Sequence, residues 1–552
     1  MRAPAACLLA LAALAAPASA SAGRFAVGLA RGADPAAVAA RVARATGGTV
    51  SPLTPFALVV TAPSAAAAER QRGVAFVERL ERSRRLAFVP NDPLAKRQWY
   101  LGAVRAFETW PLWPLRPLLS PVRVAVIDSG IDGSHPEFEG RIADWRSFVD
   151  AFPRRDSLGH GTFVAGVIAA TLNNSMGIAG IAFPARLLVA KVVRADGTIS
   201  PEDEAQAIRW AVDSGADVIN LSIAALRDPT DRRNDSYSAL EARAVEYAVR
   251  NGVVVVAAVG NGDGAPRMPW SHASYPAALP HVLGVGAVAR DGSVPEFSNR
   301  DPVYTDLVAP GDEIVSTVPR SAPGEKIACA DDGYSSSICA PDEFRRGQGT
   351  SFAAAQVSAA AALVLATRPS LAPEQVQSVL ERSATDGEPA NGCKRCYTGR
   401  DDVSGWGSLD VAAALRALSG PLPLTDDLEP NDDAGWHAAT ISGTAREVEA
   451  TIDYWDDPAD VYRVFLRKRQ RLALRLQGPT GTRVKLALWR PGTRKIEPPL
   501  FAPPGKPLVR RVAASGATKR LVYRARARGW HYVQVRADFP GSGEYSLSLV
   551  KG

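Results

Sequence analysis

The sequence contains little cysteine and little histidine, with five and six residues of these types among 552. Beyond its N-terminal segment it has no long uncharged apolar stretch, so we expect no membrane-spanning helix. We find no internal repeat. Six histidines leave few candidates for a catalytic general base. The chain is too long for a single hydrophobic core, which predicts two or three domains.

The N-terminal segment has the pattern of an export signal. Arg2 precedes an apolar run over residues 7–16, and small residues at 18–22 offer cleavage sites. A short buried helix is the alternative, but the position at the extreme N-terminus argues against it. We therefore predict that residues 1–22 are a signal peptide and that the protein is secreted or periplasmic.

The few cysteines predict disulfides in an exported chain. Removal of Cys7 with the signal leaves an even number, namely Cys329, Cys339, Cys393 and Cys396. Two local disulfides are the simplest interpretation. The Cys-Lys-Arg-Cys motif at 393–396 could instead be a redox or metal motif, but two cysteines without a nearby histidine make a poor zinc site.

Positive charge is concentrated near the C-terminus. Residues 421–552 hold 22 Lys/Arg and 14 Asp/Glu, a net charge of +8, whereas the rest of the chain is near neutral at −1. A cationic C-terminal domain can favour anionic surfaces. A solvated charged face explains the same composition, and we expect no nucleic-acid partner.

The hydrophobic pattern predicts three folded parts. Residues 23–97 read as a small α/β unit, with strands at 24–29, 56–61 and 86–90 and helices at 34–45 and 73–82. Residues 98–420 alternate short apolar strands with Ala-rich helices, which predicts a doubly wound, mostly parallel α/β sheet. Its predicted strands are 122–127, 187–193, 218–222, 253–259 and 282–288.

The third part follows a Pro-rich linker at 420–424. Residues 421–552 contain short alternating strands at 461–466, 472–476, 484–488, 532–535 and 545–549, punctuated by Gly and Pro. This pattern predicts an antiparallel β-sandwich.

Three short blocks carry residues suited to nucleophilic catalysis. Asp128 ends an apolar strand, where α/β proteins place their sites. His160 lies between glycines at the start of an apolar helix. Ser351 opens a second apolar helix, whose free backbone N–H groups and dipole lie beside it. Each block alone has a structural explanation, but a serine hydroxyl needs a base, and the base needs an orienting acid.

The order of these residues is that of subtilisin, Asp then His then Ser. Asn261 follows another apolar strand, and its amide can donate to the oxyanion of a tetrahedral intermediate; a turn residue is the alternative for Asn261. The sequence resembles the subtilase family of serine proteases over residues 98–418. The resemblance implies a serine endopeptidase with polypeptide substrates, catalytic Asp128, His160, Ser351 and Asn261, and a cis peptide bond before Pro276.

The resemblance also implies roles for the flanking parts. Residues 23–97 resemble the family's inhibitory propeptide, which acts as an intramolecular inhibitor until it is cut away between about 88 and 97; a permanently retained domain is the alternative. Residues 421–552 resemble the bacterial pre-peptidase C-terminal domain, on the motifs at 429–432, 456–462 and 541–547. Such domains are trimmed during export or help attach to substrates or surfaces.

Two sets of binding residues follow from the same resemblance. The segment that pairs with substrate as an extra strand is Ser222, Ile223 and Ala224, with Ala258 and Gly260 also lining the substrate site. Ala224 and Ala225 stand where the family usually has glycines, which puts specificity in doubt more than reaction type. A calcium loop, with a plain surface loop as alternative, would take oxygens of Glu137, Leu172, Asn174, Met176 and Ile178, with Gln98 completing the set.

Two other functions remain as alternatives. A subtilase-like body with altered substrate strands could have lost turnover and serve as a binding protein through its cationic β-domain. The intact Asp, His, Ser and Asn argue against this. An esterase on another fold is disfavoured, because a nucleophile elbow needs Gly-x-Ser-x-Gly and a different chain order.

Overall fold

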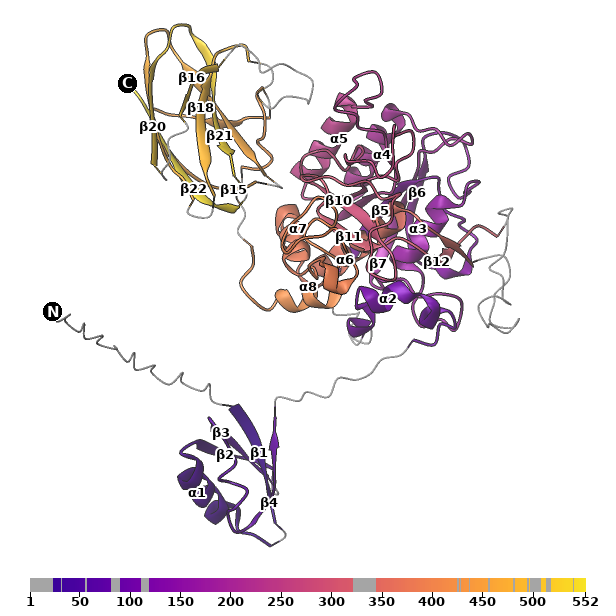
Figure 1. Cartoon of the computed structure of the whole chain (residues 1–552), viewed down its shortest axis with the longest axis vertical. Coiled ribbons are helices and arrows are strands. Elements are labelled where there is room, and N and C mark those ends of the chain that lie inside the picture. Colours follow the sequence, from indigo (N-terminus) through magenta and orange to yellow (C-terminus); the bar gives the residue numbers. More distant parts are fainter. Residues whose placement is uncertain are drawn as a thin grey trace, which may run out of the picture. The chain divides into compact units, whose positions relative to one another are not determined.

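The structure is a computed structural model of the whole chain, and it describes residues 23–320, 344–423 and 426–552 with short gaps. The gaps are residues 31, 55–56, 81–89, 111–118, 427, 436, 455–456, 480–481, 494–495, 497–507, 513–517 and 540. The predicted signal peptide and the predicted disulfide partners Cys329 and Cys339 lie outside the described residues. The chain divides into two compact units, residues 1–87 and 88–552 (Figure 1).

The first unit is a four-stranded antiparallel sheet with one helix, in the strand order β2-β3-β1-β4. Asp34 caps the helix by accepting a hydrogen bond from Ala36 N, as predicted. Val38 and Val42 on the helix are fully buried against the sheet. The elements are β1 (Gly23–Leu29), α1 (Pro35–Thr46), β2 (Thr49–Thr54), β3 (Ala57–Ala62) and β4 (Val74–Arg79).

One element of this unit was predicted wrongly. Residues 73–82, expected as a helix, contain strand β4, which pairs antiparallel with β1. Val74, Phe76 and Val77 are β-branched or aromatic residues, which favour a pleated surface, and the open edge of β1 gives them backbone partners. The strand expected at 86–90 falls largely on residues that the structure does not describe.

The second unit contains a seven-stranded parallel sheet in the order β11-β10-β9-β8-β5-β7-β6. All five predicted strands are present, and β6 and β11 were missed. Helices cover both faces, so the doubly wound α/β prediction is confirmed (Figure 1). The strands are β5 (Val122–Asp128), β6 (Ile142–Ser147), β7 (Ala185–Lys191), β8 (Val218–Leu221), β9 (Val254–Ala258), β10 (Val282–Val288) and β11 (Leu307–Pro310).

Two of the helices on one face are apolar along their whole length. They are α3 (His160–Ala169) and α6 (Thr350–Thr367), and nearly every residue of both is buried. A helix that is apolar all round must lie inside a protein core. Helices α4 (Pro201–Asp213) and α5 (Ala239–Arg250) cover the opposite face with one apolar side each.

Smaller elements complete the second unit around the sheet. The expectation of no long uncharged apolar stretch was wrong, because α6, alone among the described helices, is long and apolar enough to cross a membrane. Its burial identifies it as the core helix of the sheet domain. The other elements are α2 (Trp99–Ala103), α7 (Pro373–Arg382), α8 (Val411–Ala417), the hairpin β12 (Ile314–Thr317) and β13 (Phe344–Gly347), and the short 3-10 helices η1 (Ala95–Arg97), η2 (Ala106–Glu108), η4 (Pro136–Phe138) and η5 (Pro389–Asn391).

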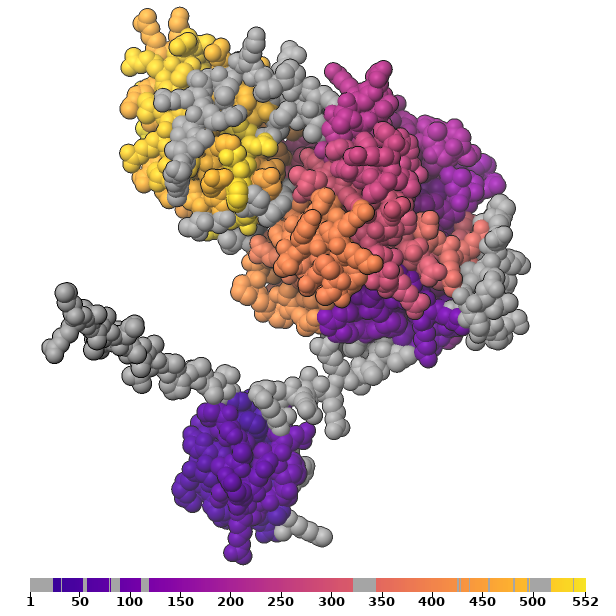
Figure 2. Space-filling view, viewed as in Figure 1, coloured from indigo at the N-terminus to yellow at the C-terminus, as the bar shows by residue number. Residues whose placement is uncertain are grey.

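The C-terminal residues form two sheets around one apolar core, ordered β14-β16-β21-β18-β19 and β15-β22-β17-β20. All five predicted strands are present, and every pairing is antiparallel except β14 with β16. The strands are β14 (Ala439–Ile441), β15 (Ala445–Asp453), β16 (Ala459–Leu466), β17 (Arg471–Gln477), β18 (Val484–Trp489), β19 (Leu508–Val512), β20 (Thr518–Arg524), β21 (Gly529–Ala537) and β22 (Ser542–Lys551). These strands are the yellow end of the chain in Figure 2.

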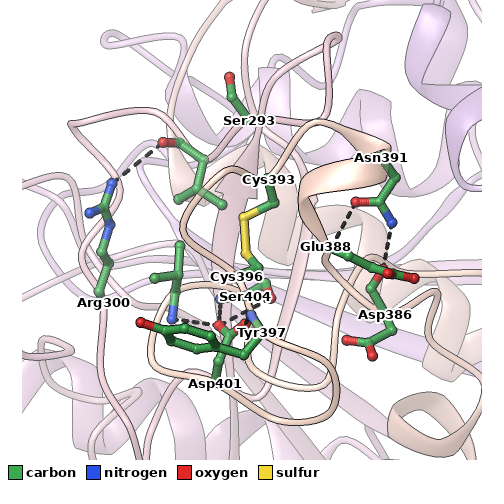
Figure 3. The surroundings of a disulfide bond; sticks show 12 residues. Ser293, Arg300, Asp386, Glu388, Asn391, Cys393, Cys396, Tyr397, Asp401 and Ser404 are labelled. Carbon is green, nitrogen blue, oxygen red and sulfur yellow. Dashed lines mark hydrogen bonds between the residues drawn. A yellow bond between two sulfur atoms is a disulfide. The ribbon is translucent and has the colours of Figure 1, made fainter.

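Cys393 and Cys396 are joined by a disulfide bond in the loop between α7 and α8 (Figure 3). Beside it, Asp401 accepts hydrogen bonds from the backbone N–H groups of Tyr397, Val403 and Ser404. The arrangement favours the disulfide interpretation of this cysteine pair over the metal one.

Two buried carboxyl groups face each other where α4 and α5 pack together. Glu204 and Glu241 are 6% and 3% exposed. Burial, followed by the charge and hydrogen bond of Glu241, raises the pKa of Glu204 well above its ordinary value. Burial likewise raises the pKa of Glu241 to about 7. The pair therefore holds a proton that the unfolded chain loses above about pH 4.5.

We predict that Glu204→Gln reduces the loss of stability with rising pH. Because the folded-state pKa values are raised, the free energy of unfolding of the wild type falls as the pH rises from about 4.5 towards 7 and above. The substituted amide keeps a donor for Glu241 without a second ionisable group. Denaturant titrations at pH 5 and pH 8 measure how far the free energy of unfolding falls between the two pH values. The fall in the wild type should exceed the fall in Glu204→Gln by an amount on the order of 1–3 kcal/mol. The exposed neighbour variant Glu202→Gln is the control, and equal slopes in both variants would contradict the prediction.

Candidate active site

The predicted catalytic residues lie at the ends of elements that meet at one edge of the parallel sheet. Asp128 is the last residue of β5, His160 the first of α3, and Ser351 the second of α6. In open α/β sheets this carboxyl edge is where sites form. Gly161 permits the close approach of α3 to β5, since a Cβ there would lie 2.1 Å from Gly130 O and 3.2 Å from the Asp128 Cβ.

His160 and Asp128 form a direct contact. The His160 Nδ1 lies 2.8 and 3.0 Å from the two carboxylate oxygens of Asp128, which is 1% exposed. Burial opposes protonation of the imidazole, but the charge and hydrogen bond of Asp128, with the charge of Asp156, raise the pKa of His160 above its ordinary value. This contact leaves Nε2 for chemistry, because the Nδ1–H is held by Asp128.

Helix α6 contacts this imidazole at the residue after Ser351. The ring of Phe352, the next residue in the chain, is 5.7 Å from the His160 ring. Among the described residues, the Ser351 hydroxyl donates to Ser222 O at 3.1 Å, and no hydrogen bond joins it to His160. Of the predicted triad, the structure therefore shows the contact between Asp128 and His160 but no hydrogen bond between His160 and Ser351.

A buried polar seam ties Ser351 to strand β8, and sequence analysis missed it. The Ser222 hydroxyl donates to Ser351 O at 2.7 Å and accepts from Asn220 Nδ2 at 2.9 Å. Ser358, two turns along α6, donates to the Asn220 side chain at 2.8 Å. Polar residues inside otherwise apolar elements were the available signal, because buried polar groups require partners.

Asn261 is held in a position that suits an oxyanion donor. Its Oδ1 accepts from both the N–H and the hydroxyl of Thr350, each at 2.9 Å. Nδ2 lies near Gly349, where a Cβ would be 3.4 Å away, and it donates to no described residue.

Asp156 is a positioning residue that the sequence did not reveal. It is 2% exposed and accepts five hydrogen bonds. The donors are Ser129 Oγ, Leu158 N, Gly159 N, Thr162 N and Thr162 Oγ1, at 2.7–3.1 Å. Asp156 thereby joins the loop after β5 to the first turn of α3, the helix that begins at His160.

The predicted substrate residues flank this site. Ser222 and Ile223 are buried after β8, whereas Ala224 is exposed at the surface. Ala258 ends β9 and is buried. Gly260 adopts φ +100°, and a Cβ there would lie 2.6 Å from Ser274 Oγ and Asn299 Nδ2.

The peptide bond between Tyr275 and Pro276 is cis, as the resemblance predicted. Tyr275 forms backbone hydrogen bonds in both directions with Ala225. The cis bond therefore lies next to the predicted substrate segment.

Comparison with known proteins identifies the sheet domain. A model described as the subtilase family matches residues 120–407, which contain all four predicted catalytic residues. The chain belongs to the subtilase family. This family consists of serine-type endopeptidases, and the subtilisin-like α/β fold of the sheet domain agrees with it.

Individual relatives match the same region. This subtilase is 36% identical over 299 residues to subtilisin of Bacillus pumilus, which covers 54% of this chain and 92% of that protein. It is 36% identical over 233 residues to thermophilic serine proteinase of Bacillus sp. (strain AK1), covering 42% of this chain but only 54% of that protein. A solved structure described as a crystal structure of a lanthipeptide protease has a TM-score of 0.47 and 25% identity, covering 60% of this chain and 99% of that one.

The predicted calcium residues gather around the loop that follows α3. Glu137 Oε2 accepts from Asn174 Nδ2 and Oε1 accepts from Ile178 N, both at 2.9 Å. Asp92, which the sequence did not reveal, accepts from the N–H groups of Asn173 and Asn174. The loop thus brings Glu137, Asn174 and Ile178 together, while the Gln98 side-chain oxygen accepts from Ala179 N.

The burial of Glu137 and Asp92 bears on whether their carboxyl groups suit a cation. Burial raises the pKa of Glu137 to about 8, with Asp92 contributing, and burial raises the pKa of Asp92 to about 6. Neither carboxyl has a cationic partner in the part of the chain that the structure describes, and such buried pairs favour either protons or a hard cation with oxygen ligands. The residues therefore fit Ca²⁺, although Asn174 Oδ1 is engaged with Met176 N.

A second acidic group lies in the C-terminal β-domain. Oxygens of Asp426, Glu429 and Asp460 lie within 4.8 Å of one another. Asp457 beside them is 7% exposed, and its Oδ1 has no hydrogen-bond partner among the described residues. Burial and neighbouring acids raise the pKa of Glu429 and Asp457 well above their ordinary values. This group also fits a divalent cation, and the density of acids at 426–433 and 456–460 was the signal for it.

We predict that Ca²⁺ raises the unfolding temperature through Glu137. A cation that binds only the folded state stabilises it by about 2.7 kcal/mol at 100 times its dissociation constant. Scanning calorimetry of an inactive variant with Ca²⁺ and with chelator measures the shift. Glu137→Gln should reduce the Ca²⁺-dependent shift, whereas the exposed neighbour variant Glu139→Gln should keep it. An unchanged shift in Glu137→Gln would show that Ca²⁺ acts elsewhere, for example at Asp460.

We predict that Asp156→Asn alters the pH profile as well as the rate. The substitution removes a charge that raises the pKa of His160 and presents an amide to the donors of Thr162. The acid limb of kcat/KM should therefore move to lower pH, and kcat should fall about tenfold or more through misplacement of the imidazole. The exposed-site variant Asp144→Asn should change neither. If kcat fell while the acid limb of kcat/KM stayed at the same pH, the role of Asp156 would be purely structural.

Proposed function

We propose that the protein is an exported serine endopeptidase made as a zymogen. Ser351 attacks the scissile carbonyl of a polypeptide, His160 takes its proton and later gives it to the leaving amine, and Asp128 holds the imidazole in the required tautomer. Asn261 Nδ2 and the Ser351 backbone N–H hold the oxyanion. The contact of His160 Nδ1 with both carboxylate oxygens of Asp128 carries the proposal, because it prepares Nε2 as the base.

The open position of Ser351 is compatible with this chemistry. Its hydroxyl is only donating to a backbone carbonyl, Ser222 O, in the segment that would pair with substrate. A rotation about one side-chain bond frees the hydroxyl for a different acceptor. Ser222, Ile223 and the exposed Ala224 would hold the substrate strand by backbone hydrogen bonds, with Ala258 and Gly260 at the neighbouring wall.

The domain roles form part of the proposal. Residues 1–22 would be the signal, 23–97 the inhibitory propeptide, 98–420 the catalytic domain and 421–552 a β-sandwich domain. Residues 90–97 pack on the catalytic body, since Leu94 and Ala95 are buried and Leu94 N donates to Gly177 O. This packing favours maturation at the N-terminal end of the range from 88 to 97, and Ca²⁺ at Glu137 would strengthen the same contact.

We predict that Ser351→Ala abolishes peptide hydrolysis and autoprocessing without unfolding the protein. Loss of the nucleophile should lower kcat by several orders of magnitude, since residues of a triad act as a unit. A fluorophosphonate probe should label the wild type and the surface variant Ser419→Ala, and should leave Ser351→Ala unlabelled. Normal processing by purified Ser351→Ala would refute the assignment. An unlabelled, inactive wild type would instead favour the binding-protein alternative.

A further inference from the structure

Four arginines form two directly opposed pairs on the C-terminal β-domain. In the antiparallel ladder between β17 and β20, Arg471 stands opposite Arg524, and Arg475 stands opposite Arg520. All four side chains are exposed. They point outwards, because the alternate residues of both strands, such as Leu474 and Leu521, are buried in the core. We call these four residues the arginine ladder.

The arginine ladder is not neutralised by acidic neighbours. Among the described residues, none of its four guanidinium groups makes an ion pair or a hydrogen bond. The acids on the same outer face are Glu447, Glu449 and Glu544, and they pair with Ser548, Ser546 and Thr451 rather than with β17 or β20. Like charges directly opposite each other in a sheet destabilise it, so the ladder is a feature that folding alone does not favour.

Protection of a sheet edge explains only half of the ladder. β20 is the edge strand, and charged side chains on an edge discourage pairing with other chains. β17 lies inside the sheet, between β22 and β20, so Arg471 and Arg475 protect no edge. Acidic residues on β20 would also protect the edge, and they would pair favourably with the arginines on β17.

Further cations extend the ladder at one end. The loop after β16 exposes Arg467, Lys468 and Arg469, and the loop after β20 exposes Arg526 and Arg528. Backbone hydrogen bonds join the two loops, from Arg469 N to Ala525 O at 2.8 Å and from Ala525 N to Gln470 O at 2.9 Å. These loops add exposed cations beside the ladder, although the Arg528 guanidinium lies over the Phe465 ring of the other sheet.

We propose that this surface docks the protein on an anionic phospholipid bilayer. Guanidinium groups bind phosphate oxygens in pairs, and the outer face of β17 and β20 presents four of them on the same side. Val522 and Val550 are 48% and 51% exposed on the same face, between and beside the arginines, so apolar contact can accompany the charge. The outward positions of β17, β20 and β22 hold no aromatic side chain on which a nucleic-acid base could stack.

The experiment measures sedimentation of the full chain with vesicles, in a Ser351→Ala background that prevents self-cleavage. Vesicles of phosphatidylglycerol and phosphatidylcholine should bind the protein, and vesicles of phosphatidylcholine alone should not. Each cation at an anionic membrane is worth about a fivefold change in affinity. Arg475→Gln/Arg520→Gln should therefore bind about 25-fold more weakly, and binding of the parent should decline as salt rises from about 0.05 to 0.5 M.

A matched double variant separates this surface from net charge. Arg483→Gln/Arg490→Gln removes two exposed cations that flank β18 in the other sheet, and it should lose less than about threefold in affinity. The unfolding temperature of Arg475→Gln/Arg520→Gln should be equal to or higher than that of the parent, because a like-charge pair is removed. Equal losses in both double variants would overturn the proposal. Binding of the ladder to soluble heparin or DNA with no binding to anionic vesicles would also overturn it. Neither result depends on catalysis by Ser351.

Discussion

Burial of the two apolar helices α3 and α6 against the parallel sheet is the constraint on which the active site depends. Both helices are almost wholly buried, so neither can slide out of the core without exposing apolar surface. The hydrogen bond from Ser358 to the Asn220 side chain also fixes which face of α6 meets β8. His160 begins α3, Ser351 is the second residue of α6, and Asp128 ends β5. Close packing of apolar residues, with glycine where α3 approaches β5, thus positions three polar side chains at one edge of the sheet.

The buried acids of the candidate catalytic site differ from the candidate metal ligands in the partners and the pKa values of their carboxyl groups. Asp128 has an imidazole partner and Asp156 has five N–H or O–H donors, so the buried oxygens of both are compensated by donors of the protein itself. Glu137, Asp92 and Glu429 also accept hydrogen bonds from protein donors, but burial outweighs these bonds and raises their pKa values. The pKa of Asp457, whose Oδ1 has no hydrogen-bond partner among the described residues, is raised as well. The first arrangement suits a fixed negative charge beside a base. The second becomes stable only with a proton or a cation.

Sequence reasoning predicted the strands that have a local pattern in the sequence. It missed the elements and polar groups that depend on contacts with distant segments of the chain. Continuous apolar runs predicted β5 and β7–β10, because a strand covered on both faces needs no alternation. β6 was missed since it is a half-exposed edge strand with Trp and Arg, and β4 was assigned as a helix because its pairing with β1 is not visible locally. Chain order suggested the predicted triad, and the structure brings two of its members, Asp128 and His160, into contact. Asp156 and the Asn220–Ser222–Ser358 seam were not predictable, because each joins elements distant in sequence.

The β-domain concentrates charges of opposite sign in separate places, and this separation bears on its role. Asp426, Glu429, Asp457 and Asp460 form one acidic group, while the arginine ladder lies on the outer face of the other sheet, where Glu447, Glu449 and Glu544 stand on the strands farther from β20. Mixing the two sets would have relieved the repulsion within each at no cost in net charge. A cation bound among the acids would cancel their field and leave the outer face more strongly positive towards a distant partner. The two features are therefore compatible with one function, in which the acidic group stabilises the domain and the arginine ladder binds a negatively charged surface.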